Sequence, residues 1–277
     1  MLVATDLTAR SDRAVLRAMS LARMLNEPLT LLYVIDEHLP KGLREHTQSW
    51  AETNLSKLCQ EVGAGVKTEV LIEVDKPVKA ITKLGMQHDY IVLGIHNQQI
   101  EQRFSATTAG KILHQSINAV LLVREEPSEP YKRAVVGVDL SLYSLPAIAQ
   151  AHNIAPEAEL HLLHAYHTPF SGMRHGHAHH HAHAEEITKQ FTGFIARELD
   201  QSNQRAREHS LTKSAFKTHL IEGEACEALR HCQLETHADL VVIASHSKPT
   251  LSRLMFGSVA ENLLQHPPCD VLVVRPF

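Results

Sequence analysis

The segment from residue 244 to residue 258 has the residue types and spacing of an anion site. Ala244-Ser-His-Ser247 ends an apolar run, and nine residues separate it from Gly257-Ser258, which opens a helical pattern. The unpaired N–H groups at a helix N-terminus attract anions, and glycine lets the backbone approach a phosphate closely. Ser258 can also cap the helix and donate its hydroxyl. The spacing predicts a phosphate site, with added charge from Lys248 and Arg253; an ordinary loop with a Gly-Ser cap is the alternative.

A second cluster could bind metal. Six of the 21 histidines lie between residues 175 and 183. Neutral imidazoles bind Zn²⁺ and similar transition metals, so we expect zinc binding here, with Glu185 and Glu186 as possible additional ligands. A solvated low-complexity loop and a response to pH are the alternatives. The candidate metal ligands are His167, His175, His177, His179, His180, His181 and His183.

Dedicated catalytic motifs are missing from the sequence. It contains no Gly-x-Ser-x-Gly, no Gly-x4-Gly-Lys-(Ser/Thr) and no His-Glu-x2-His. His96 and His246 each follow an apolar run, where a histidine more often stabilises a loop than acts as a base. Slow nucleotide hydrolysis would therefore depend on a bound triphosphate, a metal and a water. We expect a protein that is not an enzyme.

Charge and composition argue against several partners. A formal net charge of −4 gives no basic face for nucleic acid. The four cysteines form no CxxC pair, which is typical of a reducing cytoplasm. No apolar stretch approaches the roughly 18 residues of a membrane span, and the N-terminus does not resemble a signal peptide. A cytoplasmic protein without membrane or nucleic-acid partners is expected.

The chain contains an internal repeat. Asp89–His96 matches Asp239–His246 at an offset of 150 residues, and Ala119–Arg124 matches Asp270–Arg275 in the same order. Such self-similarity indicates duplication. The predicted domains are residues 1–127 and 133–277, joined by the polar, proline-containing segment near Glu125–Lys132.

Each half alternates short apolar runs with amphipathic stretches. This alternation predicts an α/β fold, in which helices cover both faces of a parallel sheet. Ligands bind such sheets at the carboxyl ends of the strands, so we expect sites after Asp6, Ile35 and Gly94 and after Asp139, Ala165 and Ala244. The predicted strands are Leu2–Thr5, Leu29–Ile35, Lys67–Ile72, Tyr90–Leu93 and Ala119–Val123, then Ala134–Val138, Glu159–Ala165, Phe216–Ile221, Leu240–Ala244 and Val271–Val274.

Ala244–Ser258, followed by Val259–Arg275, resembles the C-terminal signature of the universal stress protein family. The resemblance covers both halves and almost the whole chain. It implies two tandem doubly wound domains, each with a five-stranded parallel sheet flanked by helices. In nucleotide-binding members this loop reads Gly-x2-Gly-x9-Gly-(Ser/Thr). The resemblance therefore implies ATP or another adenine nucleotide, with adenine and ribose near the first two strands and phosphates on the loop.

The two halves match the family pattern to different degrees. In the first half Gly94 is kept, but the last glycine is replaced by Thr107, whose branched Cβ would hinder close backbone approach. We therefore expect binding mainly in the second half and little effect of Gly94→Val. Asp6 and Asp139 match the family's acidic residue near the ribose, with a turn aspartate as the alternative. The resemblance and the loop together assign nucleotide binding to Asp139, Ala165, Ala244, His246, Ser247, Arg253, Gly257, Ser258, Asp6 and Gly94.

Three functions remain open from sequence. The first is a stress-response or regulatory module that binds an adenine nucleotide. The others are a scaffold that acts through partners or zinc, and a slow nucleotide-hydrolysing enzyme. The last strands, Val120–Val123 and Val271–Val274, are apolar edges that the two domains would hide by pairing as a pseudo-dimer. A homodimer of the whole chain is also possible.

Overall fold

The computed structural model of the protein describes residues 1–95, 107–127, 130–142, 144–167, 185–197, 216–245 and 258–275. It divides into two compact units, Met1–Pro130 with Ser245–Phe277, and Tyr131–Ala244. These units are defined by contacts within the fold and differ from the sequence repeat, because Ser245–Phe277 belongs to the unit that contains the first half. The domain boundaries at 1–127 and 133–277 therefore stay a prediction.

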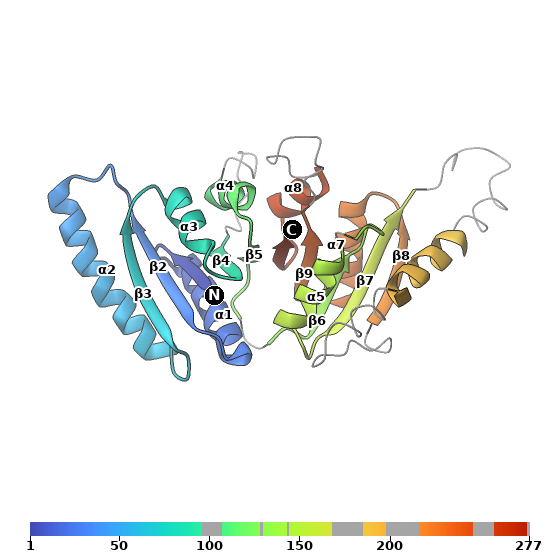
Figure 1. The fold of residues 1–277 in the computed structure, drawn as a ribbon, viewed down its shortest axis with the longest axis horizontal. Coiled ribbons are helices and arrows are strands. Elements are labelled where there is room, and N and C mark those ends of the chain that lie inside the picture. Colours follow the sequence, from blue (N-terminus) through green and yellow to red (C-terminus); the bar gives the residue numbers. More distant parts are fainter. Residues whose placement is uncertain are drawn as a thin grey trace. The chain divides into compact units, whose positions relative to one another are not determined.

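The first unit contains a sheet in the strand order β3-β2-β1-β4-β5-β10 (Figure 1). The strands β1 to β5 are parallel to their neighbours, as the alternation of strands and helices predicts. Its elements are β1 (Leu2–Thr5), α1 (Ala9–Leu25), β2 (Leu29–Ile35), α2 (Lys41–Val62), β3 (Thr68–Val74), α3 (Pro77–Gly85), β4 (Tyr90–Gly94), α4 (Thr108–Gln115), β5 (Ala119–Val123), α8 (Ser258–Gln265) and β10 (Asp270–Val274).

Local sequence explains where several of these elements begin and end. α1 ends at Asn26, which takes the left-handed conformation that a helix C-cap requires. α3 begins with Pro77, whose fixed φ suits the first turn of a helix. The central strand β4 is almost wholly buried, because helices cover both faces of the sheet.

The second unit repeats part of this arrangement. Its strand order β9-β6-β7-β8 corresponds to β4-β1-β2-β3 of the first unit, and all its strand pairs are parallel. A helix at 185–197 precedes β8. The other elements are β6 (Arg133–Gly137), α5 (Ser144–Ile154), β7 (Glu159–Tyr166), β8 (Phe216–Glu222), α7 (Ala225–Thr236) and β9 (Leu240–Ala244). The prediction of a duplicated α/β fold is confirmed.

The last strands of the two halves pair, as predicted. β10 runs antiparallel to β5, with Leu272 opposite Leu121 at the centre. Every residue of both strands is buried. The pairing therefore removes two apolar edges from solvent.

Ionic contacts accompany this strand pair within the first unit. The Asp270 Oδ2 atom accepts a hydrogen bond from Nε of Arg17 at 3.2 Å, and only 1% of Asp270 is exposed. Its Oδ1 atom accepts from the backbone N–H groups of Arg124 and Glu125. A buried carboxylate is thus held by an arginine of α1 and by the chain just after β5.

None of the helices that the structure describes has both the length and the apolar character that a bilayer crossing demands.

Candidate functional site

The turn after β1 holds Asp6 in a fixed position. Its Oδ1 atom accepts hydrogen bonds from the backbone N–H of Thr8 at 3.1 Å and from the hydroxyls of Thr8 and Ser11 at 2.6 and 2.8 Å. The Ser11 hydroxyl also lies 2.9 Å from that of Thr5. The carboxylate is therefore fixed by three donors at the carboxyl end of the first strand.

The turn after β6 is built in the same way. Asp139 Oδ1 accepts from the backbone N–H and hydroxyl of Ser141, at 3.1 and 2.6 Å, and from the hydroxyl of Ser144. The alternative interpretation, that these aspartates organise turns, therefore describes part of what both do. It does not conflict with a second role, because a carboxylate can accept several hydrogen bonds.

Both turns contain a leucine in the left-handed conformation. Leu7 has φ 57° and Leu140 has φ 61°, a region that costs a non-glycine residue about 1–2 kcal/mol. Backbone strain of this kind persists where surrounding contacts impose it, and it clusters at functional sites. The duplication thus preserves the same strained turn next to the same carboxylate in each half.

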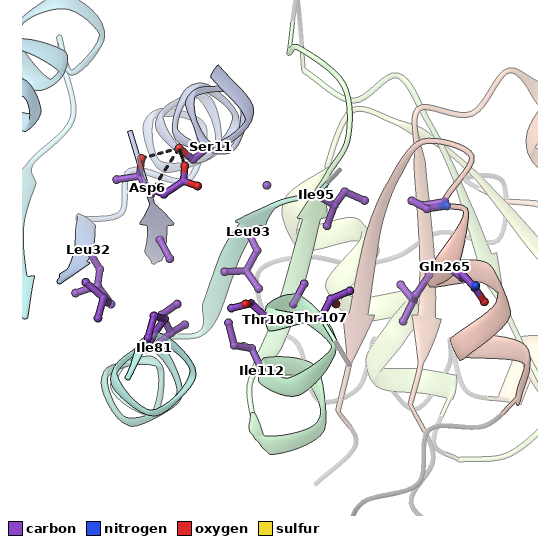
Figure 2. Close-up of a pocket in the computed structure, with 18 residues that line it drawn as sticks. Asp6, Ser11, Leu32, Ile81, Leu93, Ile95, Thr107, Thr108, Ile112 and Gln265 are labelled. Carbon is purple, nitrogen blue, oxygen red and sulfur yellow. Dashed lines mark hydrogen bonds between the residues drawn. The ribbon is translucent and has the colours of Figure 1, made fainter. Parts of the chain in front are cut away.

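A pocket of about 480 Å³ lies beside Asp6 in the first unit. Figure 2 shows its wall: Asp6 comes from the turn after β1, Ser11 from the first turn of α1 and Leu93 from β4. Thr107 and Thr108 come from the N-cap and first residue of α4, and Gln265 from the end of α8. The described lining residues are Ala4, Thr5, Asp6, Ser11, Leu32, Val34, Pro77, Ile81, Leu93, Gly94, Ile95, Thr107, Thr108, Ala109, Ile112, Leu264, Gln265 and Pro267.

The negative charge of Asp6 reaches groups around the pocket. Burial, and secondarily repulsion by the Asp6 carboxylate, raises the pKa of the Asp12 carboxyl. The same two causes raise the pKa of the Tyr33 phenol. This part of the site repels anions and favours neutral hydrogen-bond donors such as hydroxyl groups.

The start of α4 gives the opposite polarity. Thr107 is the helix N-cap, and its hydroxyl oxygen accepts a hydrogen bond from the backbone N–H of Gly110 at 3.0 Å. Thr108 and Ala109 open the helix and line the pocket. A helix N-terminus carries a partial positive charge, so this end of the pocket favours an anion. Thr107, expected to hinder phosphate approach, is accommodated here as an unstrained cap with φ −72°.

The structure brings some predicted residues together and separates others. Asp6 and Gly94 line one pocket, at the ends of β1 and β4. Ala165 lies within β7 and pairs with Ile221, and Ala244 ends β9. His246, Ser247, Arg253 and Gly257 lie outside the described residues, and Ser258 is described only as the first residue of α8.

The predicted zinc ligands fall mainly outside the described part of the chain. This applies to His175, His177, His179, His180, His181 and His183. The imidazole of His167 is exposed and lies 3.4 Å from the Glu224 carboxylate. Glu185 and Glu186 are exposed at the start of the helix at 185–197. Across the described ranges, no group of three His, Cys, Asp or Glu side chains is placed to hold a metal ion.

Sequence reasoning missed two parts of the wall. The first is the apolar side formed by Val34, Pro77 and Ile81, which were not named although a site after β2 was expected. Leu264, Gln265 and Pro267 belong to the second half of the sequence yet line a pocket whose other residues come from the first half. The antiparallel pairing of β10 with β5, which was predicted, brings them there, but no local motif marks these three residues as part of a site.

Known proteins support this fold over nearly the full chain. The universal stress protein family matches residues 1–124 and 130–275. A universal stress protein from Methanocaldococcus jannaschii is 28% identical over 149 residues, covering 52% of this chain and 82% of its own. A crystal structure of a universal stress protein from Archaeoglobus fulgidus DSM 4304 covers 99% of this chain and 97% of its own, with 19% identity and a TM-score of 0.73.

The two family matches follow one another along the chain and together span both halves. The fold, the duplicated aspartate turn and these matches agree. The chain belongs to the universal stress protein family, as a member with two tandem domains.

Proposed function

We propose that this stress protein binds an adenine nucleotide, ATP or a close relative, and acts by binding and not by turnover. The observation that carries the proposal is the pocket beside Asp6, which has an acidic turn at one end and a helix N-terminus at the other. Its volume of about 480 Å³ is within the range of small-molecule sites, about 300–1,000 Å³.

The pocket walls are matched to the parts of a nucleotide. Val34, Pro77 and Ile81 offer an apolar wall for a purine ring. Asp6 can accept hydrogen bonds from ribose hydroxyls. The amino end of α4, at Thr108, attracts phosphates. A nucleotide that places its sugar at Asp6 and its phosphates at α4 satisfies both polarities.

The second half remains a proposed site for the same ligand. Asp139 stands in the same turn as Asp6, with the same hydrogen bonds. Gly257 and Ser258 keep the glycine-serine pair that suits phosphate binding. On sequence the second half is expected to bind more tightly; the pocket supports a site in the first half as well.

The first test is identification of bound nucleotide. Freshly purified protein is denatured, and the released small molecules are identified by mass spectrometry. We expect an adenine nucleotide among the released molecules. The proposal would be contradicted by protein that releases no nucleotide and gives no heat of binding when it is titrated with ATP in a calorimeter.

Three variants locate the binding. Gly257→Val tests the second half, since a branched side chain blocks backbone approach there. Asp6→Ala and Gly94→Val test the first. Gly94 lines the pocket, so the structure changes our expectation for Gly94→Val from little effect to weaker binding. In calorimetry, Gly257→Val should remove the second-half site, Asp6→Ala should remove the first-half site, and Gly94→Val should weaken binding at the first-half site. Loss of all binding with Gly257→Val alone would place the ligand in the second half only.

Binding without turnover is proposed because the sequence supplies no dedicated base or nucleophile. Incubation of the protein with ATP and Mg²⁺ should release ADP no faster than an Asp6→Ala, Gly257→Val double variant does. Faster release by the unaltered protein would favour the slow-hydrolase alternative.

A further inference from the structure

The pocket beside Asp6 is completed by the second half of the sequence. Leu264 and Gln265 end α8, and Pro267 follows, before β10. Leu264 is 1% exposed and Pro267 is buried, so both are fixed parts of the wall. Gln265 is exposed and is the one polar side chain among these three.

Most polar groups of the pocket are already engaged. The hydroxyls of Thr5 and Ser11 and the carboxylate of Asp6 share hydrogen bonds within the turn. The Thr107 hydroxyl caps α4. Within the described residues, the side chains of Thr108 and Gln265 form no hydrogen bond. These two are the polar groups most available to a ligand.

The position of Gln265 suggests which part of a ligand it would meet. In the view of Figure 2, Thr107 and Thr108 lie between Asp6 and Gln265, and all four residues line the pocket. If the nucleotide places its sugar at Asp6 and its first phosphates at the start of α4, a longer phosphate chain continues toward Gln265. The backbone carbonyl groups at the end of α8 disfavour an anion, so the attraction has to come from the side-chain NH₂ group.

We propose that Gln265 is a specificity-determining residue of the first-half pocket. Its side-chain amide donates a hydrogen bond to the terminal phosphate and so distinguishes nucleotides by their number of phosphates. This inference rests on the proposed nucleotide function and deepens it. A residue from one copy of the duplication sets the ligand preference of the other copy. The first half alone would lack this discrimination.

The test measures ATP and AMP affinity by calorimetry in the Gly257→Val background, which removes the second-half site. In this background, Gln265→Ala should weaken ATP binding about tenfold, because hydrogen bonds to charged groups are stronger than those between neutral groups. The same substitution should weaken AMP binding by less than about twofold. Gln265→Glu should weaken ATP binding further by repulsion. Gln48→Ala, an exposed glutamine of α2, is the matched control and should change neither affinity.

The outcomes separate this inference from the function on which it rests. In one outcome, ATP binds, Asp6→Ala abolishes this binding, and Gln265→Ala weakens ATP and AMP binding equally or not at all. The pocket then binds a nucleotide, but Gln265 does not distinguish ligands by their number of phosphates. If the Gly257→Val protein binds neither nucleotide, the first-half site and the role of Gln265 are both wrong. A selective loss of ATP affinity supports both.

Discussion

At the scale of single residues, two histidines in the second unit form a partly buried contact. His161 Nδ1 of β7 lies 2.9 Å from His219 Nε2 of β8, and His161 is only 4% exposed. Glu159, Lys217 and, from α7, Glu235 are the charged groups near the pair. The pKa of His161 is lowered by burial, and then by His219; burial also lowers the pKa of His219.

This pair predicts acid sensitivity. Both histidines have a lower pKa in the folded protein than the 6.5 expected when unfolded, so the unfolded chain binds protons first as the pH falls. The contribution of the neutral pair to the free energy of unfolding is fully present above about pH 6.5 and decreases as the pH falls below it. His219→Gln should make the free energy of unfolding depend less on pH between about 7.5 and 5.5 than in the unaltered protein.

Urea unfolding at several pH values measures this effect. His46→Gln, at an exposed position of α2, serves as control and should leave the pH dependence unchanged. Equal pH profiles for His219→Gln and the unaltered protein would mean that the pair is not the group that titrates.

At the scale of elements, most strands were predicted to within a residue or two from apolar runs. β1, β2, β5 and β9 have the predicted bounds, because each is a short apolar run between polar turns. β3 extends to Val74, two residues beyond the prediction. It is an edge strand that pairs with β2 up to Ile35, and its exposed residues obscure the pattern. α3 ends at Gly85, which lies so close to β4 that an added Cβ would meet the Ile91 side chain at 2.3 Å.

The segment between β7 and the helix at 185–197 carries the prediction of zinc binding. His175-Gly-His-Ala-His-His-His-Ala-His183 belongs to the second half only. We expect zinc affinity in the micromolar range or tighter, because several imidazoles on one segment can supply three or four ligands. Replacing residues 175–183 by Gly and Ser should abolish it while nucleotide binding is retained.

Competition with a chromogenic zinc chelator measures this affinity, and a His167→Ala variant reports whether the end of β7 contributes. Undiminished zinc binding by the Gly/Ser protein would show that the ligands lie elsewhere.

At the scale of the whole molecule, the duplication could be predicted from sequence, but the composition of the pocket could not. The repeat of Asp89–His96 at Asp239–His246 is a local match that sequence shows directly. The contribution of Gln265 to the pocket beside Asp6 depends on strands far apart in the chain, β5 and β10, lying side by side. The expectation that the halves differ rested on Thr107, and its role as a helix cap appears only in three dimensions.

Asp270 is the residue on which the β5–β10 junction should depend most. Asp270→Ala removes the carboxylate that pairs with Arg17, a residue that is only 5% exposed. Breaking a buried pair by removing one partner costs about 3–5 kcal/mol. We expect a loss of this size in the free energy of unfolding, measured by urea denaturation.

Asp75→Ala, which removes an exposed ion pair with Lys79, is the control and should shift the urea midpoint far less. Similar midpoints for the two variants would argue that the buried carboxylate adds little to the junction.

The pairing of β5 with β10 also has a consequence for mass action. Two separate polypeptides that met through these strands would dissociate on dilution, and their folded fraction would vary with expression level. Here a single polypeptide holds both strands, so each meets the other at an effective concentration fixed by the connecting chain. The junction that brings Gln265 to the pocket beside Asp6 is therefore expected to persist at any concentration of the protein.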